Sequence, residues 1–309
     1  MSVLAKPYFH DEAAAYAFLE GLLWPGGPVC PHCGNADAAK IGELKGKTTR
    51  PGLKKCYECR KQFTVKVGTV YEASHIPLHK WLQATFLLTS SKKGFSAHQL
   101  HRLLGVTYKS AWFMTHRIRE AMRGGQLPPL GGEGKIVEAD ETFIGRKKGT
   151  KKGRAYHHKN AVLALVERGG SVRTFHVEKA NLAHIGRVVT NNVARESRLM
   201  TDQAAHYGPI GRVFKKHESV NHLYDEYVRD DVYTNTLESY FSVFKRGMKG
   251  VYQHCGEKHL HRYLAEFDFR YNNRSAAGVE DGERATTALK GIVGKRLTYR
   301  STNRPEAEA

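Results

Sequence analysis

The stretch Ile136-Val137-Glu138-Ala139-Asp140-Glu141-Thr142-Phe143-Ile144-Gly145 decides how this chain folds. Its apolar and β-branched residues, with a Gly-Gly pair before it and a glycine at its end, are typical of a β-strand. Side chains alternate between the two faces of a strand, so acids fall on both faces of this one. One face would carry Val137, Ala139 and Glu141, and the other would carry Ile136, Glu138 and Asp140.

Acids on an otherwise apolar strand need an explanation, because a buried carboxylate costs desolvation free energy unless a partner compensates. A bound metal cation is the commonest compensation. A solvated edge strand is the alternative, and this stretch alone does not distinguish the two. The positions of the remaining acids decide between them.

The composition indicates a multidomain protein that binds a polyanion. A chain of 309 residues, 40% of them hydrophobic, predicts two or three domains with apolar cores. The formal net charge of +19 favours nucleic acid as the partner, and the 30 acids among 49 basic residues argue against a simple basic tail. No apolar run reaches the length of a membrane span, and the N-terminus has no signal-peptide core, so we expect a cytoplasmic protein.

Four of the five cysteines form two C-x-x-C pairs, Cys30 with Cys33 and Cys56 with Cys59, separated by 22 residues. This spacing predicts a tetrahedral structural Zn²⁺ site in a reducing compartment, whereas a redox site would need only one pair. Residues 54–55 and 63–67 are expected to form short strands, which makes the segment a zinc ribbon. So small a core would need the metal to fold, and whether the ribbon contacts DNA or protein stays open.

The next part of the chain predicts a helical DNA-binding region. Residues 11–23 and 77–90 have helical periodicity, and two further helices are expected at 96–104 and from 107 to about 122. Ser96 is the expected N-cap, and Gly105 stands where a left-handed residue is needed. This arrangement resembles a helix-turn-helix, with an ordinary helical hairpin as the alternative. The second helix would expose Tyr108, Lys109, Ser110, Thr115 and His116, and DNA contact is favoured by Arg117, Arg119 and Arg123.

A basic loop follows the opening strand. Residues 146–159 contain seven Lys or Arg residues and no acid, and their position just after Asp140 favours contact with phosphate over a merely solvated face. The residues expected to bind DNA there are Lys147, Lys148, Lys151, Lys152 and Arg154. Residues 161–166 and 172–177 then predict a β-hairpin, residues 181–192 a helix, and residues 199–202 a short strand that ends in Asp202.

A carboxylate on each of three elements could meet at one site. In a helix over residues 235–248, Leu237, Phe241, Phe244 and Met248 share one face, while Asn235, Glu238, Ser242 and Lys245 share a neighbouring one. Asp140, Asp202 and Glu238 could then converge on one or two Mg²⁺ (or Mn²⁺) ions, which suit phosphoryl transfer. The alternatives are a capping box for Asn235 and Glu238, a helix cap for Asp202 and an ordinary surface lysine at Lys245. Spacing alone does not separate these alternatives.

Four motifs in order carry a resemblance to a known family. They are CPHC with YECR in residues 30–60, VEADETFIG at 137–145, LMTDQAAHY at 199–207 and YTNTLESYFSVFKRGMKGVYQHC at 233–255. Over nearly its whole length the chain resembles insertion-sequence transposases of the IS1595 type, which have an ISXO2-like catalytic domain. The resemblance implies a DNA transposase that cuts the ends of its element and joins the 3′-hydroxyl to target DNA.

The resemblance also implies roles for particular residues. Asp140 and Asp202 would bind the catalytic metal. Glu238 follows Asp202 after 35 intervening residues and precedes Lys245 by seven, as in the wider Asp-Asp-Glu enzymes. The third catalytic residue is either Glu238 or Asn235, with Glu238 favoured because a carboxylate binds Mg²⁺ more strongly than an amide. Lys245 and Arg246 would contact DNA phosphates, and Glu141 would be structural, on the opposite face of the sheet.

The implied fold class is multidomain α+β. The implied partner is double-stranded DNA, which includes the element's terminal inverted repeats and the target. The protein is expected to act as a homo-oligomer, and no membrane is involved. Two rivals are a ribonuclease-H-like nuclease or resolvase and a non-catalytic zinc-ribbon DNA-binding regulator. The expected domains are an N-terminal helix (1–23), a zinc ribbon (24–74), a helix-turn-helix-like DNA-binding region (75–123), a linker (124–135), a ribonuclease-H-like α/β catalytic domain (136–275) and a C-terminal tail (276–309) with disorder from residue 301.

Overall fold

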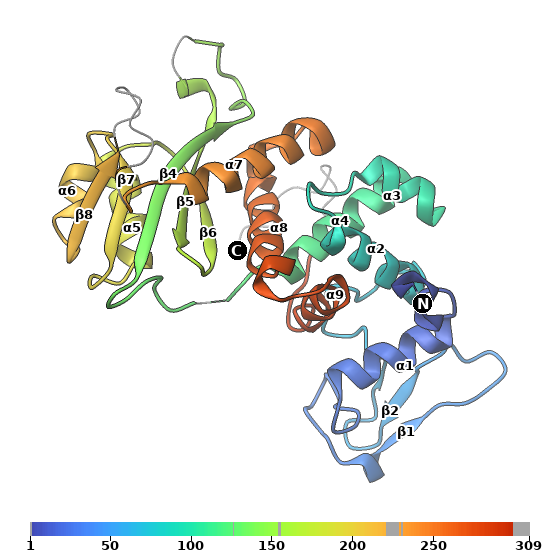
Figure 1. The fold of residues 1–309 in the computed structure, drawn as a ribbon. Coiled ribbons are helices and arrows are strands. Elements are labelled where there is room, and N and C mark those ends of the chain that lie inside the picture. Colours follow the sequence, from blue (N-terminus) through green and yellow to red (C-terminus); the bar gives the residue numbers. More distant parts are fainter. Residues whose placement is uncertain (1, 126, 154–155, 221–228, 230, 299–309) are drawn as a thin grey trace, which may run out of the picture. The chain divides into compact units, whose positions relative to one another are not determined.

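The computed structural model describes residues 2–125, 127–153, 156–220, 229 and 231–298 (Figure 1). The chain divides into two compact units. Unit 1 comprises Met1–Ser91, Phe95–Met122 and Val279–Ala309, and unit 2 comprises Lys92–Gly94 and Arg123–Gly278. Within the described ranges, no helix is both long and apolar enough to cross a membrane. The predicted disorder from Ser301 onward lies outside the described residues.

Unit 1 begins with a helix and a small sheet. Helix α1 (Glu12–Leu23) starts at the predicted place, because the Asp11 side chain accepts a hydrogen bond from the Ala14 amide and so caps it. Strands β1 (Ile41–Glu43), β2 (Lys54–Cys56) and β3 (Gln62–Phe63) form an antiparallel sheet in that order. The predicted strand through residue 67 was wrong beyond Phe63, since the Val67 amide bonds back to the Thr64 carbonyl and closes a turn.

The remaining helices of unit 1 confirm the predicted helix pair. Helix α2 (Leu78–Ser90) precedes α3 (Ala97–Leu104), which Ser96 caps by accepting a hydrogen bond from the Gln99 amide. Gly105 then adopts the left-handed conformation at φ 60°, and α4 (Tyr108–Met122) follows. These local signals were sufficient to predict both helices because caps and turns depend on neighbouring residues alone.

The burial of α4 differs from the prediction. Thr115 and His116 were expected on its exposed side, and both are buried. Helix α9 (Asp281–Lys290), which lies in the predicted tail, packs against α2 and α4. Helix α4 contacts both α2 and α9. It therefore buries more of its surface than a helix that packs against a single neighbour.

Unit 2 is built on a five-stranded sheet in the order β6-β5-β4-β7-β8. Strand β4 (Ile136–Ile144) is central and confirms the strand predicted from the opening stretch. It pairs antiparallel with β5 (Asn160–Glu167), which forms the predicted hairpin with β6 (Val172–Val177). On its other side β4 runs parallel to β7 (Arg198–Asp202), and β7 runs parallel to β8 (Lys216–Val220). Strand β8 was not predicted, since its sequence KHESV is mostly polar.

Helices cover both faces of this sheet (Figure 1). Helices α5 (Leu182–Asn192) and α6 (Tyr207–Gly211) pack on the face that carries Val137 and Ala139. Helices α7 (Asn235–Gly247) and α8 (Leu260–Asn272) pack on the opposite face, where Val162 and Ala164 project from β5. Alternation along β4 therefore directs its even-numbered acids, Glu138 and Asp140, toward α7.

Candidate active site

Three acids from three elements approach one edge of the unit 2 sheet. Strands β4 and β7 run parallel with Glu138 opposite Met200, so Asp140 and Asp202 each follow two residues later on neighbouring strands. Glu238 lies in the first turn of α7, which packs against β4. The parallel pairing of β4 and β7 is what brings the first two acids together.

The electrostatics of Asp140 reflect this gathering of charge. Burial, followed by the negative charges of Asp202, Glu141 and Glu238, raises the pKa of its carboxyl to about 7, against a hydrogen bond from the Glu141 amide that lowers it. Burial disfavours the charged carboxylate, and neighbouring carboxylates disfavour it by repulsion. A cation bound among these oxygens would relieve both costs, so the donor set suits a hard divalent metal ion.

The carboxylates of Asp140, Asp202 and Glu238 do not form a compact cluster. Within the described residues, the group of His, Cys, Asp or Glu ligand atoms that all lie within 4.8 Å of one another consists of the four cysteines, not of these carboxylates. Two metal ions in phosphoryl-transfer sites lie about 3.5–4 Å apart, so their ligands need not all meet at one point.

Glu138, for which the sequence predicts no role, connects the strand that carries Asp140 to the helix that carries Glu238. Its side chain is fully buried and accepts hydrogen bonds from Arg168 Nε at 2.7 Å, Thr236 Oγ1 at 2.9 Å and the Leu237 amide at 3.3 Å. It therefore joins β4 to the start of α7, where free amides favour an acceptor with negative charge. The signal was its position on the same strand face as Asp140, two residues earlier.

The capping alternatives for the acids do not hold. Thr234, not Asn235, is the N-cap of α7, and its side chain makes no cap hydrogen bond. At β7, Asp202 Oδ1 accepts from the Ala204 amide at 3.0 Å within a turn, whereas the N-cap of α6 is His206. Helix capping therefore explains neither Asn235 nor Asp202.

Glu141 lies on the opposite face, as expected. Tyr207 donates its hydroxyl to Glu141 Oε2 at 2.6 Å, and His206 Nε2 lies 3.2 Å from Oε1. The Glu141 carboxylate raises the pKa of His206 above its ordinary value. Glu141 is thus anchored by residues that follow β7, although its charge still reaches Asp140.

The cysteines of unit 1 form a second site, with the geometry of a tetrahedral metal centre. Cys30 Sγ lies 3.6 Å from Cys59 Sγ, and Cys33 Sγ lies 3.8 Å from Cys56 Sγ. Zn–S bonds of about 2.3 Å in a tetrahedron place the sulfurs about 3.8 Å apart, so these spacings match zinc. Hydrogen bonds, led by that from the Cys59 backbone amide, lower the pKa of the Cys56 thiol to about 6 and favour the ligating thiolate.

The predicted DNA-contact residues differ in their exposure to solvent. Lys109, Lys148, Lys151, Lys152 and Arg246 are exposed, Lys147 and Lys245 are half-buried, and Arg154 lies outside the described residues. Lys147 Nζ donates to the Glu178 carbonyl at 2.7 Å. Arg117 is buried and donates to the carbonyls of Glu72 and Leu297, so its guanidinium is engaged inside unit 1 rather than presented to a ligand.

Comparison with known proteins identifies the same two regions. Residues 10–62 match the model of a transposase zinc-ribbon domain, and residues 129–272 match that of an ISXO2-like transposase domain. A Halobacterium salinarum protein described as an uncharacterized protein in transposable element ISH50 is 28% identical over 282 residues. That similarity covers 85% of this chain and 91% of the relative.

Proposed function

Because residues 10–62 and 129–272 match transposase domain models, we propose that the chain is a transposase of the IS1595 type, which cuts the ends of its DNA element and joins the freed 3′-hydroxyl to target DNA by metal-assisted phosphoryl transfer. The observation that carries the proposal is the parallel pairing of β4 and β7, which brings Asp202 beside the buried Asp140. Burial, and after it the charges of Asp202, Glu141 and Glu238, raises the pKa of Asp140. Perturbed carboxyls gathered at one sheet edge are typical of catalytic sites.

The sheet supports a ribonuclease-H-like catalytic domain. In this proposal the antiparallel strands β6, β5 and β4 and the parallel strands β7 and β8 form the scaffold. The acids then come from the central strand, the end of its parallel neighbour and the helix packed on the same face. Rigid elements supply all three, which suits a site that must hold a phosphate in line with two oxygens.

Asp140, Asp202 and Glu238 would hold the Mg²⁺ or Mn²⁺ ions. Bound there, such ions activate the attacking oxygen and stabilise the leaving oxygen of a phosphodiester. Glu238 is favoured over Asn235 as the third ligand because its charge acts on Asp140. The ion pair of Glu138 with Arg168 would keep α7 in place against β4, so that Glu238 stays aligned with the two strand acids.

DNA would be held by basic residues on both units. Exposed Lys148, Lys151 and Lys152 follow β4 directly, and Lys245 lies two turns after Glu238 on α7. Contacts of this kind neutralise phosphates and do not read sequence. We propose that the zinc ribbon and the α3–α4 pair add DNA contacts, and that two or more copies act together on paired ends.

A cleavage and joining assay tests the proposal. The substrate is a labelled duplex that carries the DNA flanking the gene, with Mg²⁺ and an unlabelled target duplex. We expect nicking at the element end and a longer joined product, both abolished by Asp202→Asn while DNA binding persists. Nicking without joining would support a nuclease instead, and cleavage by Asp202→Asn would remove that residue from the site. Comparing Asn235→Ala with Glu238→Gln identifies the third ligand, since only the true one should lose activity.

A further inference from the structure

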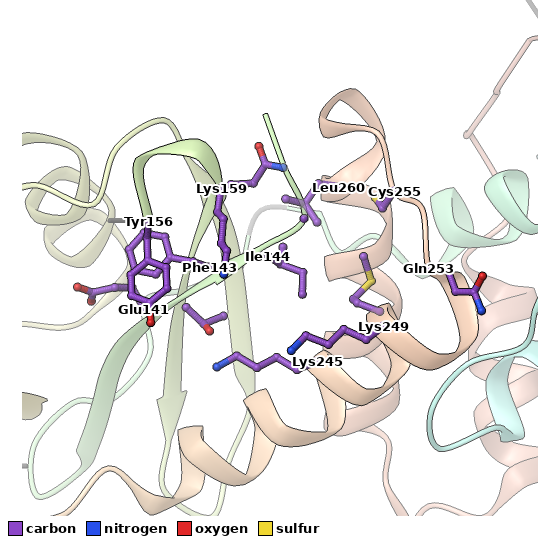
Figure 2. Close-up of a pocket in the computed structure, with 14 residues that line it drawn as sticks. Glu141, Phe143, Ile144, Tyr156, Lys159, Lys245, Lys249, Gln253, Cys255 and Leu260 are labelled. Carbon is purple, nitrogen blue, oxygen red and sulfur yellow. The ribbon is translucent and has the colours of Figure 1, made fainter. Parts of the chain in front are cut away.

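A cavity of about 620 Å³ lies in unit 2, beside the end of β4 that follows Asp140 (Figure 2). Its walls are the end of β4, the last turn of α7 and the π-helix η6 (Met248–Tyr252) that follows, together with Tyr156, Lys159 and Asn160. Glu141, the neighbour of Asp140, lies at one side of it. The volume is in the range of sites that enclose a small organic ligand.

Three lysines make this cavity basic. Lys159, Lys245 and Lys249 line it, and Figure 2 shows their side chains extending toward the same space. No ion pair within the described part of the chain joins any of the three to an acid. Glu141 is the acid among the described lining residues, and its carboxylate is already bound by Tyr207. The cavity is therefore suited to a ligand that carries phosphate.

An aromatic pair forms another wall. The rings of Phe143 and Tyr156 are stacked with centroids 4.8 Å apart and planes inclined by 10°. Tyr156 is 58% exposed although it is stacked, so its ring can accept a further partner. Lys159 Nζ lies 4.9 Å from the centroid of the same ring. Aromatic rings beside lysines are the combination that proteins use to hold an unpaired nucleotide, with the base on the ring and the phosphate on the cation.

A buried amide supplies a polar group at the same place. Asn160 lines the cavity, is 1% exposed, and its Oδ1 has no hydrogen-bond partner within the described structure. A buried acceptor without a donor is unfavourable, and such groups are rare unless a ligand or water satisfies them. An exocyclic amino group of a nucleobase is a donor of the required kind.

From these three features we propose that the cavity receives one nucleotide displaced from the DNA strand bound at the acidic site. The phosphate meets the lysines, the base stacks on Tyr156, and Asn160 Oδ1 accepts from its amino group. The inference rests on the proposed function only for the identity of the ligand as DNA. Displacing a base costs stacking and pairing energy, which is least for a base that is already unpaired.

A binding experiment tests the cavity without requiring catalysis. The full-length, zinc-loaded protein is titrated, without added Mg²⁺, against three short duplexes: one fully paired, one with a single unpaired 2-aminopurine, and one with an unpaired abasic site at the same position. We expect the unpaired base to be bound about tenfold more tightly than the abasic site, with quenched fluorescence, because stacking on an aromatic side chain contributes this much. Equal affinities would overturn the proposal.

Matched variants show where any preference arises. Tyr156→Ala should abolish the preference and the quenching, Tyr156→Phe should retain both, and His157→Ala, an exposed neighbour outside the cavity, should leave both unchanged. A preference that survives Tyr156→Ala would overturn the proposal. If the wild type prefers the unpaired base but does not cleave DNA, the result counts against the proposed enzyme function alone. If it cleaves DNA but shows no preference for the unpaired base, the result counts against the cavity alone.

Discussion

Arg168 Nε lies 2.7 Å from Glu138 Oε1, and this ion pair joins the turn after β5 to the strand that carries Asp140. Arg168 also donates to the carbonyls of Asp231 and Tyr233, which lead into α7. The Arg168 guanidinium thus positions the segment that leads into α7, the helix that carries Glu238. The pair is largely shielded from water, with side-chain exposures of 0% for Glu138 and 15% for Arg168.

Breaking this pair should therefore be costly. Arg168→Met should lower the free energy of unfolding of unit 2 by about 3 kcal/mol, because it leaves a buried carboxylate uncompensated. Glu138→Gln should cost less, and the double variant should cost less than the sum of the two. Chemical denaturation monitored by circular dichroism measures all three. Additive effects would show that the two side chains are not coupled.

Divalent cations should stabilise the protein through Asp140. Mg²⁺ should raise the melting temperature of the wild type in a concentration-dependent way, since a ligand that binds the folded state alone stabilises it. Asp140→Asn should abolish the Mg²⁺ effect, while without Mg²⁺ it should melt at or above the wild-type temperature because a repelled, half-buried charge is gone. A Mg²⁺ shift retained by Asp140→Asn would contradict the assignment. Glu43→Gln, an exposed acid of unit 1, is the control.

The zinc ribbon should depend on its metal. Removing zinc with a chelator, or replacing Cys56 with Ser, should unfold the segment around β1–β3, because the apolar cluster there is small and includes two of the cysteines themselves. Metal analysis should find one zinc per chain in the wild type and in Cys255→Ser, but none in Cys56→Ser. An unchanged thermal melt after zinc removal would contradict a structural role.

Asp268 should make stability depend on pH. Burial raises the pKa of its carboxyl to about 7 despite hydrogen bonds from Tyr240 and Thr174. Because the pKa of the Asp268 carboxyl is higher in the folded state than in the unfolded state, its contribution to stability is fully present below about pH 4. This contribution is lost as the pH rises through about 7. Asp268→Asn should remove this decline, so its stability relative to the wild type should improve by a few kcal/mol between pH 4 and pH 8. Denaturant titrations at both pH values measure the difference, and a constant difference would refute it.

Two basic residues of α4 should behave in opposite ways. Lys109→Ala, at an exposed position, should weaken binding to duplex DNA and reduce its salt dependence by about one unit of log–log slope, with little change in stability. Arg117→Ala should lower stability by about 1–3 kcal/mol, because the carbonyls of Glu72 and Leu297 lose their donor. Fluorescence anisotropy at several salt concentrations, together with thermal melts, separates the two effects.

Local features of this protein could be predicted from its sequence because they depend on residues a few positions apart. The alternation of β4, the Ser96 cap and left-handed Gly105 around α3, and the two C-x-x-C pairs each carry their signal within one segment. The acids proposed for catalysis were suggested by the resemblance of their motifs to a known family, since spacing alone left helix caps as alternatives.

Long-range contacts decided the rest. The polar strand β8 exists because β7 offers it a parallel partner, and α9 forms where α2 and α4 bury its apolar side. Arg117 became a buried donor, and Glu138 became the link between β4 and α7, although both residues look like ordinary charges in sequence. Burial and pairing depend on which surfaces meet after folding, and a carboxylate's environment is set by neighbours that the chain brings together from about a hundred residues away.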